Sequence, residues 1–510
     1  MTRNGTWLLG SRVTAMTIGL LSMPILMSAL GLTQFGAWAV LLGGTFAFGT
    51  LELGMSSAVM RWATLAMMPE SEPPGRHDLN AIMSNSLACT TSVFAVMGVP
   101  VFIAAEPLAA WLHLPVTPLL SPGQCILLIY VTVAVMALLR CTMAPMLAAR
   151  RFIPNASFTM LQSGVGSIAT CSMAWTTHRL DLVLIANALS IIGVQGVAAI
   201  WTRRRLPWKF SRSSLDRRLA YAMLRFGAAL QFSDVATFVM YQFDKLIIAG
   251  VVAPMEVAHY EVASRTSQAL GGVSNSPMVV FLPALTERHG RNEDPSSSLL
   301  SLFRLTVLGA GCFLLLPLAV SRIGLFAWLG EVGYHAAGTF ALLALAVFSS
   351  VLIAPLTMAA QAMGRASMEF RRAAGAMVVN VPVAVCLIQA YGKEGAALGT
   401  LIASLVANAL FAHWMLRALN LSWRRLMTGL ASILTPILVV AGILAAAAYS
   451  VEPLVISSRW YMAPTAAALY TTALLGLLVW LWRSGALLPE ERVWLQSLWK
   501  RLAIVRGQTP

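Results

Sequence analysis

The sequence predicts an all-α protein that crosses a membrane many times. Hydrophobic residues make up 58% of its 510 residues and charged residues only 11%, whereas a soluble domain carries about 25% charged residues. A membrane-spanning helix needs ~20 mostly apolar residues, and such runs recur along the whole chain. Basic residues gather in alternate loops between these runs. Together these observations predict a polytopic membrane protein with about 14 transmembrane helices.

The predicted spans follow one another with short connections. In chain order they lie near 10–31, 35–59, 80–103, 120–147, 153–175, 181–201, 221–250, 257–282, 299–320, 337–362, 373–390, 396–416, 427–449 and 462–482. The span near 373–390 is short, and the one near 120–147 is long and contains Arg140. The first span has no small-residue cleavage site behind it, which favours a retained anchor over a signal peptide.

The net charge of +15 follows from membrane topology rather than from nucleic-acid binding. Lys and Arg collect in loops that stay in the cytoplasm. With the amino end inside, no predicted outer loop holds more than one basic residue, whereas the inner loop 202–218 holds seven. The pattern predicts a multi-pass protein of the bacterial inner membrane with both ends in the cytoplasm.

The chain also repeats itself. The segment "APMLAARR" at 144–151 returns as "APLTMAAQAMGR" at 354–365, and both stand at the inner end of a long span. The repeat distance holds six spans, so both halves enter the membrane in the same direction. The predicted domains are an N-lobe at 1–205, a basic cytoplasmic linker at 206–218, a C-lobe at 219–420, two further spans at 421–485 and a cytoplasmic amphipathic tail at 486–510.

Several segments resemble a known family. They are "LGLTQFGAWAV" at 30–40, "LELGMSSAVMR" at 51–61, "FDKLIIAG" at 243–250, "FLPAL" at 281–285, "QAMGR" at 361–365 and "YGKEGAALGTLIA" at 391–403. In order and spacing the chain is similar to the polysaccharide repeat-unit flippases (Wzx type) of the multidrug/oligosaccharidyl-lipid/polysaccharide exporter superfamily. The resemblance implies transfer of an undecaprenyl-diphosphate-linked oligosaccharide from the inner to the outer leaflet by alternating access. It further implies membrane lipids and polysaccharide polymerase or chain-length proteins as partners, and no nucleic acid.

A diphosphate headgroup needs cationic partners, and Arg binds phosphate strongly. The candidate substrate-binding residues are Arg12, Arg61, Arg140, Arg225, Lys245, Arg265 and Arg304. Arg140 has no obvious partner near it in the sequence, and the repeat offset maps it onto Ser350. The candidate coupling or gating residues are the acids Glu52, Asp234, Asp244 and Glu261. No cofactor is expected, and coupling to protons or sodium stays open.

Four charges fall inside two apolar segments that lie antiparallel across a short turn. Residues at equal depth on these segments sum to roughly 507, which places Asp244 and Lys245 opposite Glu261 and Arg265. One interpretation is a self-neutralising scaffold. The other is a functional site, because ionisable residues inside a membrane mark function by default. The repeat supports the second interpretation, since the first lobe carries apolar residues at the equivalent positions.

Three rival functions remain. The placement of charges only weakly separates a lipid II-type flippase from a polysaccharide repeat-unit flippase. A drug or cation antiporter of the same superfamily is disfavoured, because residues 7–31 contain no Asp or Glu. A polysaccharide polymerase or ligase needs a large outer loop, and the longest predicted outer loop, at about 104–119, holds one acid and His113. The six cysteines lie in apolar segments without a CxxC pair, so no catalytic or metal site is expected.

Overall fold

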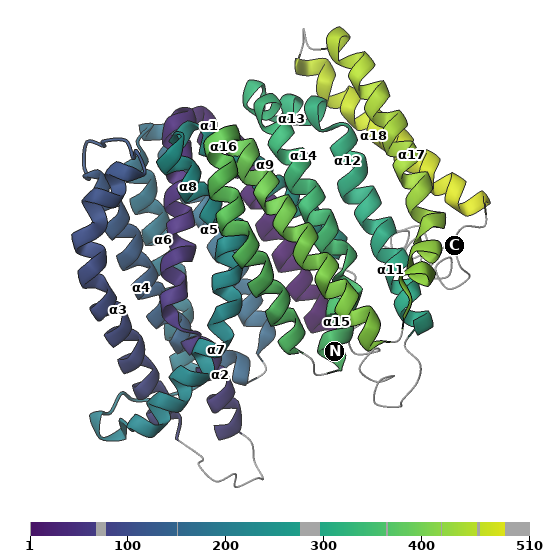
Figure 1. Cartoon of the computed structure of the whole chain (residues 1–510). Helices are drawn as coiled ribbons and strands as arrows, with labels where there is room; N and C mark the ends of the chain where they lie inside the picture. The colour runs from purple at the N-terminus through teal and green to yellow at the C-terminus, as the bar shows by residue number, and fades with distance from the viewer. Residues whose placement is uncertain are drawn as a thin grey trace, which may run out of the picture. The chain divides into compact units, whose positions relative to one another are not determined.

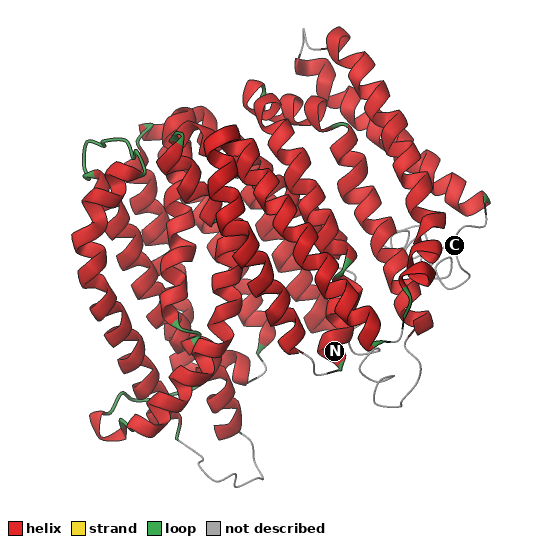
Figure 2. Ribbon diagram, in the orientation of Figure 1, coloured by secondary structure: helices red, strands yellow, loops and turns green. Residues whose placement is uncertain are grey.

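The computed structural model describes residues 2–67, 78–149, 151–275, 296–363, 366–419, 421–455 and 459–484. These residues form helices joined by short turns, and no strand occurs among them (Figure 2). The predicted all-α class is therefore confirmed. The predicted tail at 486–510 and the matched segment at 281–285 lie outside the described residues.

The helices follow the predicted order (Figure 1). They are α1 (Thr2–Gly49), α2 (Met55–Ala66), α3 (Leu79–Trp111), α4 (Pro122–Ala148), α5 (Phe152–Thr177), α6 (Leu180–Arg205), α7 (Arg217–Tyr241), α8 (Phe243–Val251), α9 (Pro254–Asn275), α11 (Ser296–Ala310), α12 (Leu316–Ala319), α13 (Ser321–Leu329), α14 (Glu331–Leu352), α15 (Ala354–Ala362), α16 (Ala366–Ala418), α17 (Trp423–Val455) and α18 (Arg459–Arg483). The predicted spans coincide largely with helix where the structure describes them, with short breaks such as Leu53–Gly54 and Gln242.

Composition and length alone identify nine of the described helical stretches as able to cross a membrane. The stretches containing α1 and α16 each hold two predicted spans. Helices α5, α7 and α9 fall outside the nine, although each coincides with a predicted span. These three helices carry many of the polar side chains considered below.

Two glycines divide the longest helices. Gly31 inside α1 has φ 74° and ψ 168°, and Gly392 inside α16 has φ 58° and ψ −133°. Both conformations are essentially restricted to glycine. Gly31 ends the first predicted span and Gly392 lies between two later ones, so the turns expected from the sequence are present as single-residue breaks.

The contacts divide the chain into two compact units. The first comprises residues 1–261 and 385–396, and the second comprises 262–384 and 397–510. In the first unit α1 packs against α5, α4 packs against α3 and α6, and α7 packs against α2 and α3. In the second unit α14 packs against α13, and α17 packs against α11 and α18. The repeat lobes at 1–205 and 219–420 stay a prediction, because compactness does not test a repeat.

In the first unit α2 and α7 cross at two glycines. A Cβ added to Gly227 would lie 2.3 Å from the carbonyl oxygen of Leu53, and one added to Gly54 would lie 2.4 Å from the carbonyl oxygen of Gly227. The backbones therefore meet where any side chain would clash. Buried Met55, Met223 and Leu219 surround this crossing and complete an apolar core.

We expect Gly227→Ala to destabilise the first unit. The new methyl group would overlap a backbone carbonyl that cannot rotate away, and overpacking of this kind costs about 1–3 kcal/mol. Gly19→Ala is the matched control, because nothing lies within 4 Å of its added Cβ. Thermal unfolding of the purified protein should show a lower midpoint for Gly227→Ala only. Equal midpoints for both variants would contradict the close crossing.

Candidate functional site

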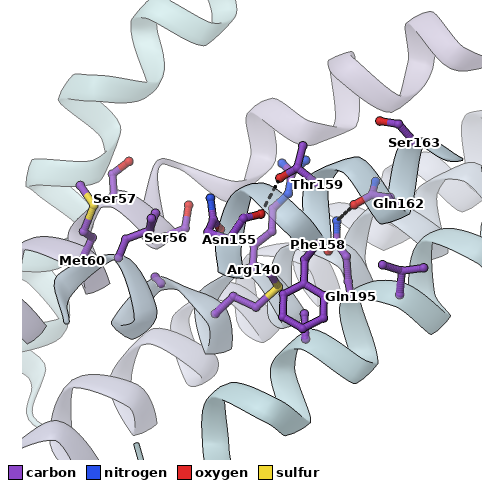
Figure 3. A pocket seen from close by; sticks show the side chains of 15 residues that line it. Ser56, Ser57, Met60, Arg140, Asn155, Phe158, Thr159, Gln162, Ser163 and Gln195 are labelled. Carbon is purple, nitrogen blue, oxygen red and sulfur yellow. Dashed lines mark hydrogen bonds between the residues drawn. The ribbon is translucent and has the colours of Figure 1, made fainter. Parts of the chain in front are cut away.

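The first unit contains a cavity of about 400 Å³. Its walls come from α2, α4, α5 and α6 (Figure 3). Its size lies within the range of small-molecule sites. The polar side chains that line it are Ser56, Ser57, Arg140, Asn155, Thr159, Gln162, Ser163 and Gln195. Met60, Phe158 and Val194 contribute apolar surface.

Arg140 brings the positive charge to this lining. It stands on α4, its side chain is 47% exposed, and its Nη1 lies 3.9 Å from Glu52 Oε2. The partner that the sequence did not reveal therefore comes from another segment. Arg140 is held beside a carboxylate but keeps about half of its surface open to a ligand.

Glu52 is positioned by a break in the backbone. Leu53 and Gly54 both adopt left-handed conformations between the first helix and α2. The buried carboxylate of Glu52 then accepts a hydrogen bond from the backbone N–H of Ser56, at 3.1 Å. A carboxylate at a helix N-terminus satisfies free N–H groups and the helix dipole. Glu52 thus stabilises α2 and orients Arg140, and its predicted coupling role stays a prediction.

Helix α5 presents a polar face to the cavity. Asn155, Thr159 and Gln162 follow the spacing i, i+4 and i+7, so they share one side of the helix. Gln195 on α6 donates from Nε2 to Gln162 Oε1 at 3.0 Å. Gln195 is 5% exposed, and its Oε1 has no hydrogen-bond partner. A buried acceptor without a donor costs about 1–3 kcal/mol.

The chemistry of this lining is one guanidinium beside several uncharged amides and hydroxyls. Such a surface suits an anionic group joined to a molecule rich in hydroxyls. The amides and hydroxyls do not stand out in the sequence, since neutral residues do not interrupt an apolar run as charges do. The spacing of 155, 159 and 162 was the signal that could have found them.

Ser350, onto which the predicted repeat maps Arg140, lies in a hydrogen-bond network of the second unit. Asn408 Nδ2 donates to Ser349 Oγ at 2.9 Å and to Ser350 Oγ at 3.2 Å. Asn408 Oδ1 accepts from Arg372 Nη1 at 3.2 Å, and Arg372 is paired with Glu369. Here the side chains hydrogen-bond to one another, whereas in the first unit Arg140 lines a cavity.

The other predicted phosphate ligands differ in the exposure and contacts of their side chains. Arg61 stacks on aromatic rings, with its Cζ 5.1 Å from the Trp62 centroid and 4.4 Å from the Phe226 centroid. Arg225 is exposed on α7. Arg12 lies within α1, but its side chain is outside what the structure describes.

Arg304 is 5% exposed and is committed to the scaffold. Its Nη1 donates to the carbonyl oxygen of Gly429 and to Ser432 Oγ, each at 2.8 Å. These bonds join α11 to α17. The role of Arg304 in substrate binding stays a prediction.

The predicted charge cluster appears at the α8–α9 turn. Lys245 forms a buried ion pair with Glu261, and Tyr260 donates its hydroxyl to Asp244 Oδ2 at 2.7 Å. Lys245 also donates to Gln242 Oε1 at 2.6 Å. The contacts of Lys245 with Glu261 and of Asp244 with Tyr260 agree with the predicted register to within three positions. Tyr260 and Gln242 were not expected as members.

Two other residues were predicted for the charged sites. Arg265 lies on α9, four residues after Glu261. Asp234 is exposed on α7 and interacts electrostatically with Arg140. The functional roles of both residues stay predictions.

A second charged group lies at the start of the predicted span 257–282. Lys393 Nζ is 2.6 Å from Glu256 Oε2, and His259 Nδ1 is 3.4 Å from the same oxygen. Burial alone would raise the pKa of Glu256, but the hydrogen bond and charge of Lys393, with His259 beside them, lower that pKa below its ordinary value. The carboxylate therefore stays ionised and ties α9 to the Gly392 turn. Within the described residues, no group of three His, Cys, Asp or Glu side chains could hold a metal ion.

Comparisons with known proteins identify a family and a shared fold for this chain. A family model described as "Polysaccharide biosynthesis protein" matches residues 1–289. A comparison with curated protein sequences finds no match. Among solved structures, a lipid II flippase MurJ in an inward closed conformation has a TM-score of 0.73 at 11% identity, covering 93% of this chain and 98% of its own.

Two transporters of the MATE family are also similar in fold. One, an inward-facing multidrug resistance transporter of the MOP superfamily, has a TM-score of 0.55 at 15% identity and covers 79% of this chain and 94% of its own. The other, from Vibrio cholerae, has a TM-score of 0.52 at 14% identity and covers 82% of this chain and 96% of its own. At these sequence identities, the similarity to the solved structures shows a shared fold only.

Proposed function

Because the chain belongs to the polysaccharide biosynthesis protein family, we propose that it is a membrane flippase for a lipid-linked oligosaccharide. The substrate is an oligosaccharide on undecaprenyl diphosphate, which moves from the inner to the outer leaflet by alternating access. The observation that carries this proposal is the cavity in which Arg140 stands among uncharged amides and hydroxyls. We place the protein in the bacterial inner membrane, with both ends in the cytoplasm.

The chemistry of the lining supports this substrate class. A diphosphate and its sugars cannot enter hydrocarbon without losing their hydrogen bonds to water, at a cost of several kcal/mol per group. Arg140 can replace water around phosphate oxygens through charge-assisted hydrogen bonds. Asn155, Thr159 and Gln162 can replace it around hydroxyl groups. A protein with such a cavity lowers the barrier without forming or breaking a covalent bond.

The test is transfer in liposomes that contain only the purified chain. A fluorescent farnesyl-diphosphate oligosaccharide is placed in both leaflets, and a membrane-impermeant reductant quenches the outer one. We expect the protein to expose the inner-leaflet probe to the reductant, while fluorescent phosphatidylcholine in matched liposomes stays protected. Protein-independent quenching, or equal transfer of both lipids, would contradict the proposal.

The same liposomes separate the rival transport functions. A lipid II-type flippase would move a probe carrying a muramyl-peptide headgroup in preference to the oligosaccharide probe. A drug or cation antiporter would instead accumulate a hydrophobic cationic dye when a proton or sodium gradient is applied. Covalent extension of the oligosaccharide, detected by mass, would indicate a polymerase.

A further inference from the structure

The cavity is longer than an anionic group alone requires. Asn155 and Gln162 are separated by seven residues on α5, which corresponds to ~10 Å along the helix axis. Arg140 supplies the charge from α4, and the polar face of α5 extends the wall with neutral hydrogen-bonding groups (Figure 3). A diphosphate would engage Arg140. The remaining polar wall fits a neutral group attached to that diphosphate.

Gln195 points to one position on this wall. It is 95% buried, beside Val194 and Ala198, which also face the cavity. An apolar side chain of similar shape would pack there without leaving an acceptor unbonded. The hydrogen bond that Gln195 makes goes to Gln162 Oε1, at 3.0 Å. This bond fixes the amide of Gln162 and leaves its Nε2 for a ligand.

We propose that Gln162 is a specificity-determining residue that binds the sugar attached directly to the diphosphate, and that Gln195 is the positioning residue that holds it. The inference rests on the proposed function, whose diphosphate group it assigns to Arg140. Gln162 Nε2 donates a hydrogen bond to an oxygen of that sugar, and Asn155 and Thr159 extend the same contact surface. The ligand class is therefore a prenyl diphosphate carrying a neutral sugar.

The experiment compares two probes on the purified full-length protein. One is farnesyl diphosphate, and the other is farnesyl diphosphate carrying one glucose. Dissociation constants are measured by calorimetry for wild type, Gln162→Met, Gln195→Met, the double variant, and the control Ser157→Ala. Ser157 is exposed on α5 and does not line the cavity.

We expect wild type to bind the sugar-bearing probe more tightly than the bare one. Gln162→Met should weaken the sugar-bearing probe about tenfold, as loss of one hydrogen bond at the upper end of its range would do. The same variant should leave farnesyl diphosphate unchanged. Gln195→Met should act in the same direction, and the double variant should be no worse than Gln162→Met. Such non-additivity separates a positioning role from a general loss of packing.

Several outcomes would overturn the inference. They are equal loss of both probes in Gln162→Met, no loss of either, and additive losses in the double variant. Wild type that binds both probes equally would refute the sugar contact while leaving the proposed function standing. Wild type that binds neither would refute the proposed function together with the inference. If Gln195→Met fails to fold, Gln162→Met decides alone, because the Gln162 side chain is partly exposed.

Discussion

Replacing Arg140 by Gln should abolish most transport while leaving the protein folded in the membrane. The guanidinium is the charged group of the described cavity lining, and hydrogen bonds to charged groups contribute about 1.5–3 kcal/mol each. Losing them corresponds to a roughly 10- to 150-fold weaker interaction with a diphosphate. The fold should survive because the side chain is 47% exposed and Glu52 keeps its hydrogen bond to the Ser56 backbone.

The measurement is export of surface glycan in cells and probe transfer in liposomes, each normalised to the amount of protein in the membrane. Arg140→Lys should retain part of the activity, since Lys keeps the charge but cannot bind phosphate through two parallel bonds. Arg204→Gln is the matched control, because Arg204 is an exposed arginine of the same unit that does not line the cavity. Normal export by Arg140→Gln would remove Arg140 from the site.

Features that depend on long runs of the chain were predictable from the sequence. Apolar runs of the length of a bilayer predicted the spans, and Gly31 marked a turn that other residues could not adopt at low cost. The register between α8 and α9 was also predictable. A short turn fixes which residues of two antiparallel helices lie at the same depth, and Lys245 and Glu261 meet close to that depth.

Features that depend on packing between distant segments were not predictable. Glu52 meets Arg140 only because the left-handed residues Leu53 and Gly54 break the helix before α2. Gln162 and Gln195 are neutral, so their pairing leaves no trace in a charge pattern. In the sequence, Arg304 cannot be told apart from an arginine at the cytoplasmic entrance of a cavity, because the positive-inside rule accounts for both. The difference between a ligand site and a helix–helix contact lies in burial and partners, which one sequence does not contain.

The buried Lys245–Glu261 pair should give the largest stability effects in the first unit. Both side chains are at most 4% exposed, so removing either partner leaves a charge without its counterion in a poorly solvated place. Removing one partner of a buried ion pair lowers the free energy of unfolding by about 3–5 kcal/mol. Lys245→Met and Glu261→Leu should therefore each lower the thermal midpoint strongly. The double variant Lys245→Met/Glu261→Leu should lose less than the sum, because it removes the pair as a whole and fills its volume with apolar groups.

Transport by the double variant distinguishes a scaffold from a functional site. If the pair only joins α8 to α9, the double variant should recover both folding and transport. If Glu261 takes part in coupling or gating, folding should recover while transport stays absent, since a leucine cannot bind a proton or a cation. Tyr260→Phe controls for the neighbouring contact, because it removes the hydroxyl bonded to Asp244 without altering the ion pair. If the stability loss of the double variant equals the sum of the two single losses, the pair is not coupled. The register between α8 and α9 would then be wrong.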